Sequence, residues 1–168
     1  MEGVEAMEET RPFAMQRKRA LPCHDGTIPV ELSLMPVRYH FSRCFLGEIG
    51  DEECREIAMS ACRIACMALD VSRGKISSMI LRRLMTSVCI KRLETLSLLM
   101  LNHMRTDSAL RRKMCVLPVI PRMINGMIIS PDTLEISVHV MIGDLHHWTS
   151  LVLRRMGSRW MCTTADVG

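Results

Sequence analysis

At 168 residues, the chain is long enough to form one domain with a hydrophobic core. Its apolar fraction of 48% excludes a wholly disordered protein, and its net charge of +4 is modest. Aromatic residues make up only 4% of the chain whereas 16 residues are methionine, so we expect an adaptable core of Met, Leu and Ile. We predict a flexible charged tail over residues 1–20 and a single globular domain over residues 21–168.

The chain contains 8 cysteines, which raises the question of disulfide bonds. The first ten residues are acidic and polar, and the absence of an apolar run there argues against a secretory signal peptide. Most of the cysteines fall on apolar positions of expected helices. We therefore predict reduced, buried thiols in a cytosolic protein, and no apolar run reaches the ~20 residues of a membrane span.

An early strand is expected where apolar and polar residues alternate over residues 28–41. Period-two alternation is typical of a half-buried strand. Pro29 and Pro36 cannot donate to a strand ladder, so they place this segment at a sheet edge or a bend.

A helix is expected to begin at Asp51, which is a candidate N-cap, with Glu52 and Glu53 at the positive end of the helix dipole. Small and apolar residues recur along it at spacings of three and four, which predicts one buried stripe. The residues of this stripe are Cys54, Ala58, Cys62, Ala65 and Leu69.

The middle of the chain is expected to be helical as well. We predict a second helix over Lys75–Val88, a third over Ile90–Met104 and a short fourth over 108–114 that Asp107 caps. Extended chain follows because proline ends a helix. These prolines are Pro118 and Pro121.

The C-terminal third changes to period-two alternation, which predicts strands over Thr133–Ile142, Leu145–Arg155 and Arg159–Thr164. Turns at Gly143-Asp144 and at 156–158 separate them, so an antiparallel meander is expected. The predicted fold class is α+β, with the helical middle packed on a small antiparallel β-sheet formed by the early strand and the C-terminal meander.

Basic residues are concentrated in the helical middle, where only Glu94 and Asp107 oppose them. They alternate with Leu, Ile and Met, which indicates folded helices with a cationic face rather than a disordered tail. Such a face is typical of proteins that bind RNA or acidic membranes, and the lack of aromatic residues in this block disfavours base-specific readout. The candidate anion-binding residues are Arg73, Lys75, Arg82, Arg83, Lys91, Arg92, Arg111, Arg112 and Lys113.

Two chemical sites are alternatives to this binding surface. His147-Trp148 and the later Asp166 resemble the His-Trp strand and following Asp of ubiquitin-like-protein proteases, but Cys162 precedes the Asp, whereas that family's nucleophile follows it. A zinc site would use Cys62 and Cys66 or the adjacent histidines 146 and 147, although cysteines four apart on an apolar stripe are more often part of a core. We expect no catalytic residues, metal or cofactor.

The order of elements is similar to that of rhabdovirus matrix proteins, especially the short plant-infecting, cytorhabdovirus-like type. The resemblance rests on architecture: the charged tail, an early strand, a helical middle and a late hairpin. The corresponding segments are Met1–Ala20, TIPVELSLMPVRYHFSR (27–43), DEECREIAMSACRIACMALD (51–70) and GSRWMCTTADV (157–167). The PPxY budding motif of animal members does not occur. The resemblance implies a structural virion protein that condenses the nucleocapsid, contacts membrane and self-associates.

The leading hypothesis is therefore a non-enzymatic viral matrix protein whose partners are viral nucleoprotein or RNA, an acidic membrane surface and further copies of itself. Its expected location is the virion and membranes in the host cytoplasm, or the nucleus if Arg17, Lys18 and Arg19 form a localisation signal. Self-association is assigned to a tail segment, Arg11, Pro12 and Phe13, that docks on a neighbour. The alternatives are a nucleic-acid-binding regulator, such as a silencing suppressor or movement-related factor, and the cysteine protease.

Overall fold

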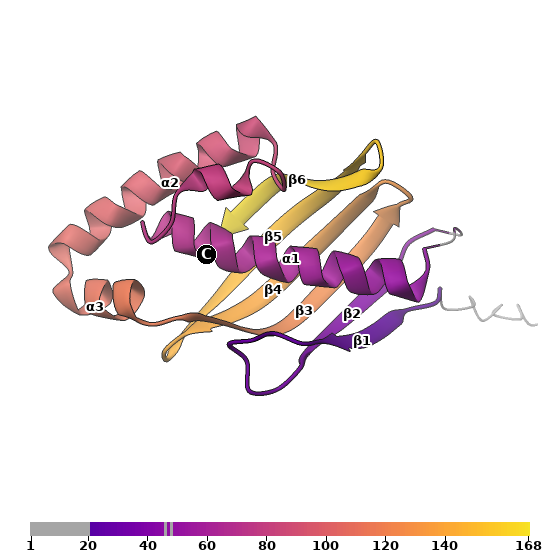
Figure 1. The fold of residues 1–168 in the computed structure, drawn as a ribbon, viewed down its shortest axis with the longest axis horizontal. Helices are drawn as coiled ribbons and strands as arrows, with labels where there is room; N and C mark the ends of the chain where they lie inside the picture. The colour runs from indigo at the N-terminus through magenta and orange to yellow at the C-terminus, as the bar shows by residue number, and fades with distance from the viewer. Residues whose placement is uncertain (1–20, 46, 48) are drawn as a thin grey trace, which may run out of the picture.

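A computed structural model describes residues 21–45, 47 and 49–168 and shows one layer of helices on one six-stranded β-sheet (Figure 1). The fold class is α+β, as the sequence predicts. The elements in chain order are β1 (His24–Ile28), β2 (Val37–Arg43), α1 (Asp51–Ser72), the 3-10 helix η1 (Ser78–Leu81), α2 (Ser87–Thr106), α3 (Ser108–Val116), β3 (Val119–Ser130), β4 (Thr133–Ile142), β5 (Leu145–Met156) and β6 (Arg159–Val167).

The strands lie side by side in chain order, from β1 at one edge to β6 at the other. All neighbouring pairs are antiparallel except β2 and β3, which run parallel because the whole helical middle connects them. The sheet is therefore mixed, whereas the sequence predicted an antiparallel one. The predicted meander of β4, β5 and β6 is confirmed, and Gly143 (φ 62°) and Gly157 (φ 65°) supply the left-handed conformation in its two turns.

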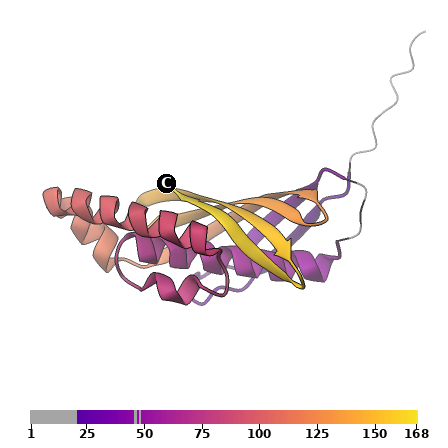
Figure 2. The same cartoon turned by 90° about the horizontal axis from the view of Figure 1, so that it is seen from above.

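One face of the sheet is covered by helices and the other is open (Figure 2). Along β4, Leu134, Val138 and Val140 are buried, whereas the intervening side chains, such as Glu135, are more exposed. Long helix α1 crosses the covered face, and the stripe of small residues that the sequence predicted on it is buried. Small side chains allow the helix to lie close to the sheet, which positions the other helices beside it.

The early strand predicted over 28–41 is wrong in part, because the two prolines enclose a loop. Strand β1 ends at Ile28, and residues 29–36 turn before β2 begins at Val37. The alternation is real in β2, where Tyr39 and Phe41 are buried. The same alternation is misleading in the loop, because proline has no N–H to donate to a neighbouring strand and its φ angle is fixed.

The second predicted helix, Lys75–Val88, is also wrong. Only the short η1 forms, and the chain then runs past β6, where the Cys162 N–H donates to the carbonyl of Leu84 at 2.8 Å. The Thr86 N–H donates to the carbonyl of Cys162 at 2.9 Å. Tertiary hydrogen bonds thus replace helical ones, and Thr86 becomes the N-cap of α2 instead.

Strand β3 was not recognised as a strand by the sequence analysis, which expected only extended chain after Pro118. The strand tolerates Pro121 because its register with β4 shifts between Pro121 and Met123. The short helix α3 is confirmed, and the Asp107 carboxylate caps it by accepting from the N–H groups of Ala109 and Leu110.

Candidate anion-binding surface

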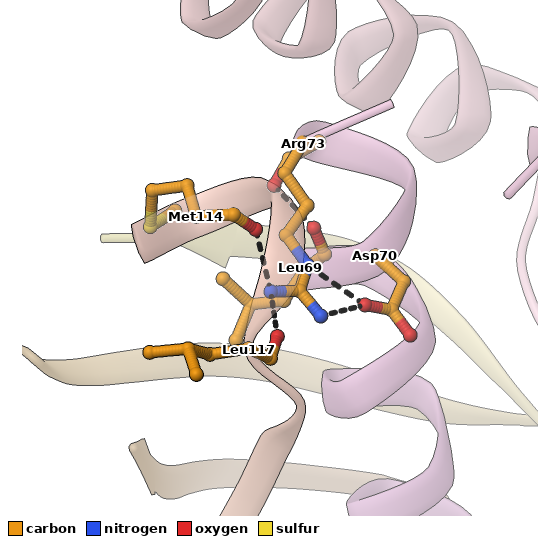
Figure 3. A network of polar contacts seen from close by, with 6 residues as sticks. Leu69, Asp70, Arg73, Met114 and Leu117 are labelled. Carbon is orange, nitrogen blue, oxygen red and sulfur yellow. Dashed lines mark hydrogen bonds and ion pairs between the residues drawn. The ribbon is translucent and has the colours of Figure 1, made fainter. Parts of the chain in front are cut away.

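The basic block of the sequence divides into one buried arginine and a set of exposed cations. Arg73 is only 2% exposed, and its guanidinium is bound within the protein (Figure 3). It donates to the Asp70 carboxylate at 2.8 and 2.5 Å and to the carbonyls of Met114 and Leu117 at 2.7 and 2.6 Å. Arg73 therefore ties the end of α1 to the end of α3, and its prediction as a surface anion ligand is wrong.

Lys113 is exposed but not free of acidic partners. Its ammonium lies 2.9 Å from both carboxylate oxygens of Asp144, in the turn between β4 and β5. This contact lowers the pKa of the Asp144 carboxyl below its usual value. Because an acid already neutralises Lys113, it contributes less to an anion-binding surface than its position suggests.

The other predicted cations are exposed. Within the described part of the chain, none of them forms an ion pair. The two acids of this block are engaged elsewhere: Glu94 accepts from the Ser78 hydroxyl at 2.5 Å, and Asp107 caps α3. The exposed cations are Lys75, Arg82, Arg83, Lys91, Arg92, Arg111 and Arg112.

Helix α2 adds exposed apolar side chains to these cations. Leu98 and Leu99 are 65% and 63% exposed, and Val88, near the start of the helix, is exposed as well. Val88 precedes Lys91 and Arg92 by three and four residues, and Leu98 and Leu99 follow them by seven. This spacing places these five side chains on one outward side of the helix. We call these five residues the outer stripe of α2: Val88, Lys91, Arg92, Leu98 and Leu99.

The opposite side of α2 holds the helix against the domain through its buried residues Cys89, Leu93 and Met104. Helix η1 contacts α2 and repeats the pattern of the outer stripe, because Met79 and Ile80 are exposed next to Arg82. The sequence showed these cations among Leu, Ile and Met, but it did not predict that their apolar neighbours are exposed. Their helical spacing was the signal that could have revealed them.

The protease-like residues do not assemble a triad. His147 pairs with buried Val140 and so faces the helices, whereas Asp166 pairs with exposed Ser150 on the open face of the sheet. The His147 ring nitrogen Nδ1 lies 3.0 Å from the carbonyl oxygen of Gly168 instead. Since Cys162 is buried beside β5, the three groups cannot share a substrate.

The candidate metal ligands are also separated. Cys62 and Cys66 lie on α1, whereas His146 and His147 lie on β5 and point to opposite faces of the sheet because they are consecutive. Among the residues that the structure describes, no three His, Cys, Asp or Glu side chains gather in a way that could hold a metal ion.

The open face of the sheet has a polar centre and a cluster of aromatic rings. His139 stacks between His146 and Trp148, with ring centroids 5.2 and 4.7 Å apart. The pKa of His139 is lowered by burial and by the nearby charges of His146 and Arg122. A row of polar side chains beside these rings crosses all six strands in register: Asp25, His40, Asn125, Ser137, Ser150 and Asp166.

Comparison of the chain with protein-family models, with curated proteins and with solved structures finds no match. Over the described residues, no helix combines the length and the apolar character needed to cross a membrane. The tail positions assigned to self-association (Arg11, Pro12, Phe13) and to nuclear localisation (Arg17, Lys18, Arg19) lie outside the described residues.

Proposed function

We propose that this chain is a non-enzymatic assembly protein of the matrix type, which docks on an acidic membrane surface, contacts ribonucleoprotein and self-associates. The observation that carries the proposal is the outer stripe of α2, where exposed Lys91 and Arg92 lie among exposed Val88, Leu98 and Leu99. The stripe belongs to a helix that is anchored by its other side, so it can meet a flat surface without unfolding.

A lipid surface uses both halves of the stripe. Leucine side chains insert at the boundary between headgroups and acyl chains, while lysine and arginine stay with the lipid phosphates. RNA uses only the cations, because a phosphate backbone gains nothing from exposed Leu98 and Leu99. The apolar half of the stripe therefore favours membrane as the partner of α2.

Two exposed cations of the neighbouring helix suit contacts with ribonucleoprotein. Arg111 and Arg112 lie on α3, beyond the end of α2, and are exposed. Contacts of this kind to phosphate are sensitive to salt and independent of base sequence. Lys91 and Arg92 lie in the same helical layer, so RNA draws on the cations of both helices, whereas only a membrane also uses the leucines of α2.

Flotation with vesicles of phosphatidylcholine, with and without phosphatidylserine, tests the membrane assignment. The wild-type chain should float only with the acidic vesicles, and both Lys91→Gln/Arg92→Gln and Leu98→Ser/Leu99→Ser should reduce the floating fraction. Arg38→Gln/Arg154→Gln is the matched control, because it removes two exposed cations from the open face of the sheet and should float like wild type.

Binding of a fluorescent single-stranded RNA, measured by anisotropy, separates the proposal from the regulatory alternative. The Lys91→Gln/Arg92→Gln variant should lose RNA affinity, whereas Leu98→Ser/Leu99→Ser should keep it. A chain that binds RNA but never floats with acidic vesicles would overturn the membrane assignment and favour a nucleic-acid-binding regulator.

A further inference from the structure

The loop between β1 and β2 exposes an unusual concentration of apolar surface. Leu32 and Met35 are 62% and 70% exposed, and Leu34 between them is fully exposed. The loop is held in a defined turn: the Ser33 N–H donates to the carbonyl of Val30 at 3.0 Å, and the Ser33 hydroxyl donates to the carbonyl of Met35 at 2.6 Å. The loop is therefore an apolar protrusion whose backbone conformation is held by hydrogen bonds.

An apolar groove lies directly beside this protrusion. Its volume is about 780 Å³, and the loop forms one wall while α1 and the start of β3 form the other. Helix α2 packs on the β6 side of α1, so among the residues that the structure describes no helix covers the flank of α1 that faces the loop (Figure 1). The side chains that line the groove include Val30, Leu32, Met59, Cys62, Met67 and Pro118.

We infer that this patch is a self-association surface, on which two copies of the chain pack about a twofold axis and each loop enters the groove of the other copy. This inference deepens the self-association part of the proposed function. A twofold contact uses the same patch on both partners, so the patch must carry both a protrusion and a matching hollow. The loop and the groove meet that requirement because they adjoin each other.

Charge around the patch is self-complementary as well. Glu31 extends from the loop, and Arg63 and Lys75 lie on the opposite rim of the groove. None of the three forms an ion pair within the part of the chain that the structure describes. Crossing two loops over two grooves brings the Glu31 of each copy toward the basic rim of the other.

The chemistry of the loop favours a second copy over a membrane. Between Pro29 and Pro36 the loop contains Glu31 and no Lys or Arg. An acidic protrusion is repelled by anionic headgroups, in contrast to the outer stripe of α2. The apolar side chains of the loop therefore have an acidic neighbour, whereas those of the outer stripe of α2 have basic ones, and this difference favours protein as the partner of the loop.

Sedimentation velocity of the full chain over a concentration series tests the inference. Wild type should show a reversible monomer–dimer equilibrium, and Leu34→Asp should raise the dissociation constant at least tenfold because each dimer loses two buried leucines. Leu34 is fully exposed in the single chain, so the substitution leaves the core intact. Leu98→Ser/Leu99→Ser is the matched control and should dimerise like wild type.

Charge exchange gives a second, independent measurement. Glu31→Lys alone and Arg63→Glu/Lys75→Glu alone should each weaken the dimer, and the triple variant should recover affinity.

A wild-type chain that stays monomeric, a Leu34→Asp variant that dimerises normally, or a triple variant weaker than both parents would overturn the inference. Loss of flotation in Leu34→Asp with unchanged dimerisation would assign the loop to membrane instead. Loss of dimerisation with unchanged flotation leaves the membrane assignment standing.

Discussion

Replacing Arg82, Arg83, Lys91 and Arg92 with Gln should weaken binding to both acidic vesicles and RNA while the domain stays folded. All four side chains are exposed, and none forms an ion pair over the described ranges 21–45, 47 and 49–168. Their removal therefore leaves no buried acid without a partner. The expected change in the free energy of unfolding is within about 0.5 kcal/mol.

The expected loss of lipid affinity follows from the number of charges. Each Lys or Arg near an acidic membrane surface contributes ~1 kcal/mol, so four contribute at most ~4 kcal/mol, or about 700-fold in the partition coefficient. Arg82 and Arg83 lie in the turn that follows η1 and the other two lie on α2, and a flat bilayer need not contact both groups equally. If only one pair makes contact, the loss falls to ~2 kcal/mol, or about 30-fold.

Vesicle sedimentation at ~0.1 M salt, where the screening length is ~10 Å, measures this partition coefficient directly. For RNA, each lost phosphate contact should reduce the slope of log affinity against log salt by ~0.7. Unchanged binding of the folded variant to both partners would refute the reasoning and remove these residues from the site. R38Q/R154Q and K91Q/R92Q each remove two positive charges. If only K91Q/R92Q loses affinity for the vesicles, the position of the cations matters and not the net charge of the protein.

Three further predictions concern the interior and the tail. Native-state labelling with a thiol reagent should be slow at Cys54, Cys62 and Cys66. Burial raises the pKa of Cys54 to about 11, and the hydrogen bond with Cys62, together with burial, raises the pKa of Cys66. The hydrogen bond with Cys66 lowers the pKa of Cys62, so slow labelling of Cys62 follows from its burial, at 4% exposure. Rapid labelling of all three would contradict the packing of α1. Urea denaturation of Arg73→Met should show a loss of about 2–4 kcal/mol, because the Asp70 carboxylate and two backbone carbonyls lose their donor. An undiminished free energy of unfolding would refute that role. Deleting residues 1–20 should lower the amount of large assemblies seen by light scattering at low salt; if the truncated chain assembles as readily, the tail segment around Phe13 is not the linker.

Local patterns were sufficient for the elements whose structure depends on their own residues. The alternation of apolar and polar residues over 133–142 predicts β4 correctly, because a strand with one buried face shows this pattern in its own sequence. The stripe of small residues defines the buried side of α1 for the same reason. Asp107 caps α3 through hydrogen bonds that span only three residues, so its role is visible in the sequence.

Tertiary contacts decided the rest. The segment before α2 has helical periodicity, yet it forms hydrogen bonds with the backbone of Cys162, far along the chain, and no local pattern contains that partner. In the sequence Arg73 is one cation among many. In the structure it is buried, and it donates to two carbonyls near the end of α3 and to the carboxylate of Asp70. The sequence determined which residues are charged and which are apolar. Only the packing of the chain determined which of them reach its surface, because burial depends on neighbours that are distant in sequence.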